Sequence, residues 1–138
     1  MLDYFIGQVD REKVQMSIGS EMAAVKKPLI PGKRMTESGN VVAFGPKPED
    51  NFVKNTRMGR KIMLQQRGKG SYVMEVTFVG GQKTEITVDS GAEESVCPLH
   101  WGEQFGKIPS AKTMKFRSAS GGQIDHFGHR DVVVECPF

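Results

Sequence analysis

Apolar and polar residues alternate most clearly in the middle of the chain. In residues 72–79, every second side chain is apolar, and this period of two predicts a half-buried β-strand. Residues 84–88 are rich in β-branched side chains, which favour strands, and Gly80-Gly81 lies between the two runs. We therefore predict a β-hairpin whose turn spans residues 80–83.

Shorter runs of the same character predict further strands on both sides of this hairpin. They cover residues 13–18, 40–44, 51–54, 61–65, 94–97, 113–117, 123–127 and 131–135. The glycine-rich residues 118–122 predict the tip of a second hairpin. Residues 32–39 have little β-branched character and end at a glycine, so they predict a helix of about two turns. The close spacing of the strand signals favours an all-β fold, a small barrel or sandwich with one or two short helices.

The length and composition are those of one domain over residues 1–138. The chain is 38% apolar and 25% charged, and a chain of this length can bury a hydrophobic core without metal or disulfide support. The short run Gly68-Lys-Gly-Ser71 is the one plausible seam between residues 1–70 and residues 71–138. It is too short to be a flexible linker, so we expect the two segments to fold together.

The distribution of apolar and charged residues and the number of cysteines bear on where the protein is located. No apolar run approaches the roughly 20 residues of a membrane span, and residues 1–19 contain five charged side chains, unlike a secretory signal. Two cysteines are far fewer than a disulfide framework needs. We therefore expect reduced thiols and a cytoplasmic location, with no membrane span.

The net charge of +3 divides unevenly along the chain. Residues 1–70 contain 13 Lys and Arg against 7 Asp and Glu, whereas residues 71–138 contain 6 against 9. This asymmetry could help the two segments dock or could mark a weak nucleic-acid surface. The basic residues are dispersed and hardly interleaved with aromatic ones, so we interpret them as solvated surface and do not expect a nucleic-acid partner.

The sharpest candidate for chemistry is Asp89, which follows the predicted strand 84–88 and precedes Ser90 and Gly91. A carboxylate placed there sits in a tight turn, where the Gly91 N–H can point at it and Ser90 can bond to a second copy of the loop. Aspartic peptidases build their sites in this way. Two such carboxylates share one proton and activate a water molecule without any cofactor or metal.

The chain contains one Asp-Ser-Gly sequence. A working enzyme of this kind would therefore be a homodimer in which each chain contributes one Asp89 across a two-fold axis. As a bare tripeptide, Asp-Ser-Gly is also ordinary turn chemistry.

The residues around this tripeptide favour the catalytic loop over an ordinary turn. Residues 84–98 resemble the active-site segment of retropepsin-like aspartic proteases of retrotransposons, and residues 116–128 resemble the flap of that family. The resemblance implies a small acid-protease barrel and a polypeptide substrate. It places Asp89, Ser90 and Gly91 in the catalytic loop. The residues that would contact substrate are Ala92 in that loop and Gly121, Gly122 and Ile124 in the flap.

The order of the elements departs from the family. Residues 14–21 and 27–35 resemble the second half of such a protease, and residues 38–62 and 70–73 resemble the region that follows the protease in copia-type elements. The chain thus has the order of a circular permutant or of a window cut from tandem copies. A second departure is Pro31, which interrupts the apolar-apolar-Gly element expected at Leu29, Ile30 and Gly32.

Two other interpretations remain open. Cys97, His100, His126, His129 and Cys136 offer enough ligands for a zinc site, although histidines three apart on a strand point to opposite faces unless Gly128 bends the chain. The second is a retropepsin-derived binding or scaffold module without turnover. The function that the residues favour is an aspartic endopeptidase that hydrolyses peptide bonds.

Overall fold

The structure is a computed structural model that describes residues 6–10, 13–57, 59–68, 70–109, 116–117 and 123–137. The described part is mostly β, as the alternating pattern predicts, with one short α-helix and two 3-10 helices. In chain order the elements are β1 (Ile6–Asp10), β2 (Lys13–Ala23), β3 (Leu29–Pro31), α1 (Gly32–Glu37), β4 (Asn40–Ala43), η1 (Pro48–Asp50), β5 (Phe52–Asn55), β6 (Lys61–Met63), β7 (Gln65–Arg67), β8 (Ser71–Phe78), β9 (Lys83–Asp89), β10 (Val96–Cys97), η2 (Glu103–Phe105), β11 (Phe116–Arg117), β12 (Gln123–Ile124) and β13 (His126–Pro137).

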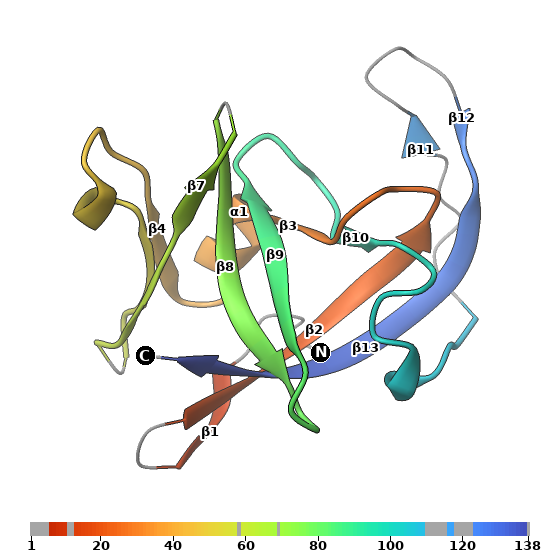
Figure 1. The fold of residues 1–138 in the computed structure, drawn as a ribbon, viewed down its shortest axis with the longest axis horizontal. Coiled ribbons are helices and arrows are strands. Elements are labelled where there is room, and N and C mark those ends of the chain that lie inside the picture. The colour runs from red at the N-terminus through yellow and green to blue at the C-terminus, as the bar shows by residue number, and fades with distance from the viewer. Residues whose placement is uncertain are drawn as a thin grey trace.

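The largest sheet closes on itself. Along it, β2 pairs with β10, β10 with β3, β3 with β9, β9 with β8 and β8 with β13, while β13 also pairs with β2. The pairings among these described strands therefore form a closed circuit, to which β1 and β7 add at β2 and β8. Figure 1 shows the long strand β13 crossing β2 and the β8–β9 hairpin standing beside them.

Both segments of the chain contribute strands to this circuit. β2 and β3 come from residues 1–70, whereas β8, β9, β10 and β13 come from residues 71–138. The three-residue strand β3 is inserted between β9 and β10, parallel to the first and antiparallel to the second. Segments far apart in sequence are thus hydrogen-bonded neighbours.

Two smaller units flank the closed sheet. The three-stranded sheet β4-β5-β6 lies on the left of Figure 1 beside α1, and the β11–β12 hairpin lies at the upper right. Val53 and Ile62 of the first unit are 2% exposed and belong to the same buried cluster as the closed sheet. Both segments of the chain contribute to this cluster, whose members are Met16, Ile18, Met22, Ile30, Met35, Val53, Ile62, Leu64, Met74, Val76, Phe78, Ile86, Val88, Cys97, Trp101, Val132, Val134 and Cys136.

The hairpin predicted around residues 80–83 is confirmed, with Gly80 and Gly81 both at positive φ in the turn between β8 and β9. The helix predicted over residues 32–39 is also confirmed as α1. The tip predicted at residues 118–122, which includes Gly121 and Gly122, lies outside the described residues.

Several strand boundaries differ from the prediction, and three of the differences change how the strands are connected or paired. The predicted strands 123–127 and 131–135 have other bounds in the structure, because β12 ends before Asp125 and the residues after it form the single long strand β13. Strand β2 extends well past the predicted end at residue 18, because β13 pairs along its whole length. The predicted strand 61–65 divides into β6 and β7, which join different sheets. Within the described residues, no helix is both long and apolar enough to cross a membrane.

Candidate functional site

Asp89 ends β9, a strand hydrogen-bonded on both sides. Its neighbours are β8, where Tyr72 pairs with Val88, and β3, where Pro31 pairs with Asp89 itself. Val88 is 3% exposed and anchors the strand in the core, whereas Asp89 is half-buried. The buried strand therefore delivers this carboxylate to the surface at a fixed position.

The turn that follows bonds to the carboxylate. The Gly91 N–H donates to Asp89 Oδ1 at 2.8 Å, and the Ala92 N–H donates to the Asp89 carbonyl at 3.5 Å. This hydrogen bond from a backbone N–H holds one carboxylate oxygen in place. The other oxygen, Oδ2, has no hydrogen-bond partner among the described residues and remains available.

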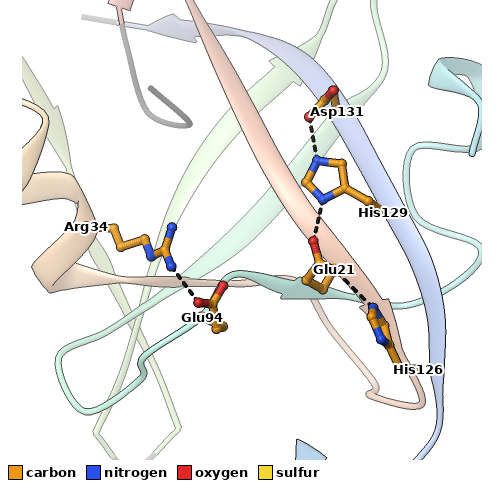
Figure 2. Close-up of polar contacts among 6 residues, drawn as sticks. All are labelled: Glu21, Arg34, Glu94, His126, His129 and Asp131. Atoms are coloured by element: carbon orange, nitrogen blue, oxygen red, sulfur yellow. Dashed lines mark hydrogen bonds and ion pairs between the residues drawn. The ribbon is translucent and has the colours of Figure 1, made fainter. Parts of the chain in front are cut away.

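The start of α1, which follows β3, packs against this turn. Gly32 begins α1 directly against it, so that a Cβ placed on Gly32 would lie 3.6 Å from Ser90 Cα. Further along α1, the Arg34 guanidinium forms an ion pair of 2.5 Å with Glu94, five residues beyond Asp89 (Figure 2). Pro31 ends β3 and precedes the helix without breaking the element. The floor of the Asp89 turn is therefore built by the other segment of the chain.

A small cavity of about 180 Å³ opens beside the carboxylate. Phe44 and Tyr72 line it as a tilted aromatic pair whose ring centroids are 4.7 Å apart. Of the described residues that line it, Asp89 alone carries an acid. The described lining of this cavity thus combines a single carboxylate with an aromatic wall.

The other residues predicted for this site lie in the Asp89 turn, in β12 or outside the described residues. Ser90 is exposed beside Asp89 and lines the same cavity, and Ala92 is half-buried in the turn. Ile124 lies in β12 and pairs with Phe116 of β11. Gly121 and Gly122 lie outside the described residues.

A second polar cluster, not anticipated as a unit, joins β2 to β13. Glu21 is 3% exposed, and its two carboxylate oxygens contact two imidazoles (Figure 2). His126 Nε2 lies 2.9 Å from Glu21 Oε1, and His129 Nδ1 bonds to Glu21 Oε2. His129 Nε2 in turn lies 2.7 Å from Asp131 Oδ1. A buried carboxylate is tolerated when it is hydrogen-bonded in this way.

These contacts define the proton state of His129. Both of its ring nitrogens face carboxylate oxygens, which only accept when ionised, so the ring can donate to both only as an imidazolium. Burial disfavours the charged ring, but the hydrogen bonds to Glu21 and Asp131 and their negative charges outweigh it and raise the pKa of His129. The ring therefore carries a positive charge to higher pH than a free histidine does.

The zinc interpretation required Gly128 to bend the strand, and it does. A bulge between His126 and Gly128 turns both histidines of β13 towards Glu21. The two rings bind this carboxylate, and among the described residues no group of three or more His, Cys, Asp or Glu is arranged to hold a metal.

The cysteines are free thiols buried in the core. Burial raises the pKa of Cys136 to about 12 and also raises the pKa of Cys97. Because the thiolate is the reactive form, both side chains are chemically inert under ordinary conditions. His100, the remaining zinc candidate, is exposed and lines a different cavity.

Comparison of the chain with protein-family models, with curated proteins and with solved structures gives no match. The interpretation of the site therefore rests on its own geometry and on the residues that form it.

Proposed function

We propose that the protein is an aspartic endopeptidase whose active site forms when two copies bring their Asp89 carboxylates together. The observation that carries the proposal is the Asp89 turn. It is a carboxylate at the end of a buried strand, held through one oxygen by the Gly91 N–H and supported by α1 of the other segment.

In this mechanism the two carboxylates share one proton and titrate as a coupled pair. One of them accepts a proton from the attacking water. The other, protonated, donates to the carbonyl oxygen of the scissile peptide and later helps protonate the leaving amine. The Gly91 N–H keeps Oδ1 of each carboxylate in place, which leaves Oδ2 for the water and the substrate.

Two features of the single chain favour a shared site. The cavity beside Asp89 is about 180 Å³, below the roughly 300–1,000 Å³ of typical ligand pockets. Its described lining contains one acid, whereas the reaction needs two. A second copy facing the first would supply both the missing carboxylate and the missing wall for a polypeptide substrate. The two free thiols suit a reducing compartment, so we place this activity in the cytoplasm.

The Asp89→Asn variant tests the mechanism. The amide is nearly isosteric and still accepts the Gly91 hydrogen bond, but it cannot act as a base, so hydrolysis should fall to background. The assay is cleavage of fluorescently labelled, unfolded casein at mildly acidic pH, with and without pepstatin as a transition-state analogue. Circular dichroism and thermal melting should show an unchanged fold.

The matched control is Glu85→Gln, which removes an exposed carboxylate from the same strand β9. This variant should cleave casein as the natural chain does. Cleavage that persists in Asp89→Asn would contradict the aspartic mechanism. A folded chain without pepstatin-sensitive cleavage at any concentration would favour the alternative, a binding or scaffold module derived from such a protease.

A further inference from the structure

A second and larger cavity lies away from Asp89. It has a volume of about 610 Å³, and its lining residues are Leu99, His100, Glu103, Gly106, Lys107 and Arg130, none of which lines the Asp89 cavity. Its size falls within the roughly 300–1,000 Å³ of small-molecule sites. Its base is Arg130 of β13, which is only 5% exposed.

Arg130 holds the loop that forms the wall of this cavity. Its Nη1 donates to the carbonyls of Leu99 and Trp101, each at 2.7 Å, and its Nε donates to the carbonyl of Gly106 at 2.6 Å. Ile108 and His129 each donate a backbone N–H to the carbonyl of the other, and these two hydrogen bonds hold the far end of the loop against β13. These bonds fix the backbone of the loop on one side of the cavity, which lowers the entropic cost of ordering that backbone around a ligand.

The same guanidinium keeps binding capacity for a ligand. Its second amino group, Nη2, makes no hydrogen bond to any described residue, and no described carboxylate forms an ion pair with Arg130. Nη2 is not sealed in the interior either, because Ser95 Oγ is the one fully buried side-chain nitrogen or oxygen of the described residues without a partner. A buried cation that lines a cavity and keeps an unused donor group favours an anion there.

The charges of the lining indicate what kind of anion fits. Arg130 and Lys107 bring two positive charges and Glu103 brings one negative charge, so the balance matches a monoanion better than a dianion. Leu99, which is 45% exposed, adds an apolar wall. We propose that this cavity is a binding site for a small organic monoanion, a carboxylate carried on an apolar body. The site is independent of the proposed peptidase activity.

The direct test is an NMR titration of the isotope-labelled full chain, in which the Arg130 Nε–Hε signal and the Gly102 and Gly106 amides are followed. The probes are hexanoate, its neutral analogue hexanamide and inorganic phosphate. Hexanoate should give saturable shifts in the millimolar range that suits a ligand of its size, and hexanamide should give none. Equal shifts with hexanamide, tighter binding of phosphate, or no saturable shift with hexanoate would each overturn the assignment.

Two charge variants are expected to change the affinity for hexanoate in opposite directions. Both keep Arg130, because its loss could unfold the loop. Lys107→Gln should weaken hexanoate binding about two- to fivefold, and Glu103→Gln should strengthen it by a similar factor, as expected for one exposed charge. The matched control is Lys83→Gln, an exposed lysine that lines neither cavity and pairs with Glu75. Identical affinities in all three variants would contradict the proposed site.

Discussion

At the scale of single residues, the contacts of His129 determine its protonation state. Its ring bridges buried Glu21 on β2 and Asp131 on its own strand, and His126 reaches the other oxygen of Glu21. Since both ring nitrogens must donate, the charged ring is the one that these contacts stabilise. The raised pKa of His129 is thus linked to the free energy of unfolding.

The sign of this linkage can be tested with His129→Gln. Because the folded-state pKa is raised, the charged ring contributes its full stabilisation below about pH 6.5, the usual histidine value, and loses it as the pH rises through the folded pKa. The variant should therefore be least stable relative to the natural chain near pH 6, and the difference should shrink at higher pH. Urea unfolding at a series of pH values measures it.

The control for this measurement is His100→Gln, which removes an exposed ring that lies outside the Glu21 cluster. This variant should keep the pH dependence that the Glu21 cluster gives to the stability of the natural chain. An NMR titration that places the pKa of His129 below about 6.5 would contradict the assignment of an imidazolium.

At the scale of elements, the bulge in β13 directs the cluster. Gly128 has a φ of +124°, and a Cβ placed on it would lie 2.9 Å from the Ile108 carbonyl oxygen. The same oxygen accepts a hydrogen bond from the His129 N–H, so the atom that a Cβ on Gly128 would press against also holds the loop to β13. A straight strand would send His126 and His129 to opposite faces, and the bulge is what allows both to reach Glu21.

The Gly128→Ala variant measures this constraint. An alanine there incurs backbone strain of about 1–3 kcal/mol, and it also pushes against the Ile108 carbonyl. The matched control is Gly80→Ala, because Gly80 has a similar φ of +118° but open space around it. In urea unfolding Gly128→Ala should be the more destabilised, by about 1 kcal/mol for the disturbed bridge. Equal losses would show that the contact with Ile108 does not matter.

At the scale of the whole molecule, one chain closes its sheet without a partner. Both β1 and β13, at the two ends of the described residues, pair with β2 of the same chain. The proposed dimer therefore has to form through other surfaces, and the Asp89 turn is one that must face the second copy. Exposed Phe44, which also lines the Asp89 cavity, lies in a position to be covered by it.

Mixing experiments distinguish a shared site from a self-contained one. In an equimolar mixture of natural and Asp89→Asn chains at fixed total concentration, random pairing leaves about one quarter of the dimers with two carboxylates. Casein cleavage should therefore fall to about one quarter of that of the natural chain. A fall to about one half would mean that each chain works alone. Sedimentation at the assay concentration gives the dimer population independently.

The local pattern was enough to predict several elements. The alternation of Met74, Val76 and Phe78 with Glu75 and Thr77, and the glycine pair that follows, determine the β8–β9 hairpin, because neighbouring residues supply both the strand period and the turn. The same holds for α1, which ends just before a glycine. The position of Asp89 at a strand end followed from the same local reasoning, and so did the Gly91 hydrogen bond to its carboxylate.

Contacts between distant residues were beyond any local pattern. In the sequence, Glu21 is one charged residue that lies beyond the predicted end of its strand at residue 18. The pairing of β2 with β13 extends this strand and buries the Glu21 carboxylate between two histidines. In the same way, the charge of Arg130 does not indicate whether it is solvated or directed into a cavity.

The sequence by itself therefore determined the mostly-β class, the central hairpin and the acid at the strand end, since these depend on the period of side chains a few residues apart. Tertiary structure alone decided that β3 lies beside β9, that Gly32 supports the Asp89 turn, and that Arg130 forms the base of a cavity. The physical reason is that burial and charge pairing depend on which surfaces meet when the sheet closes, and residues that meet there are separated by tens of positions along the chain.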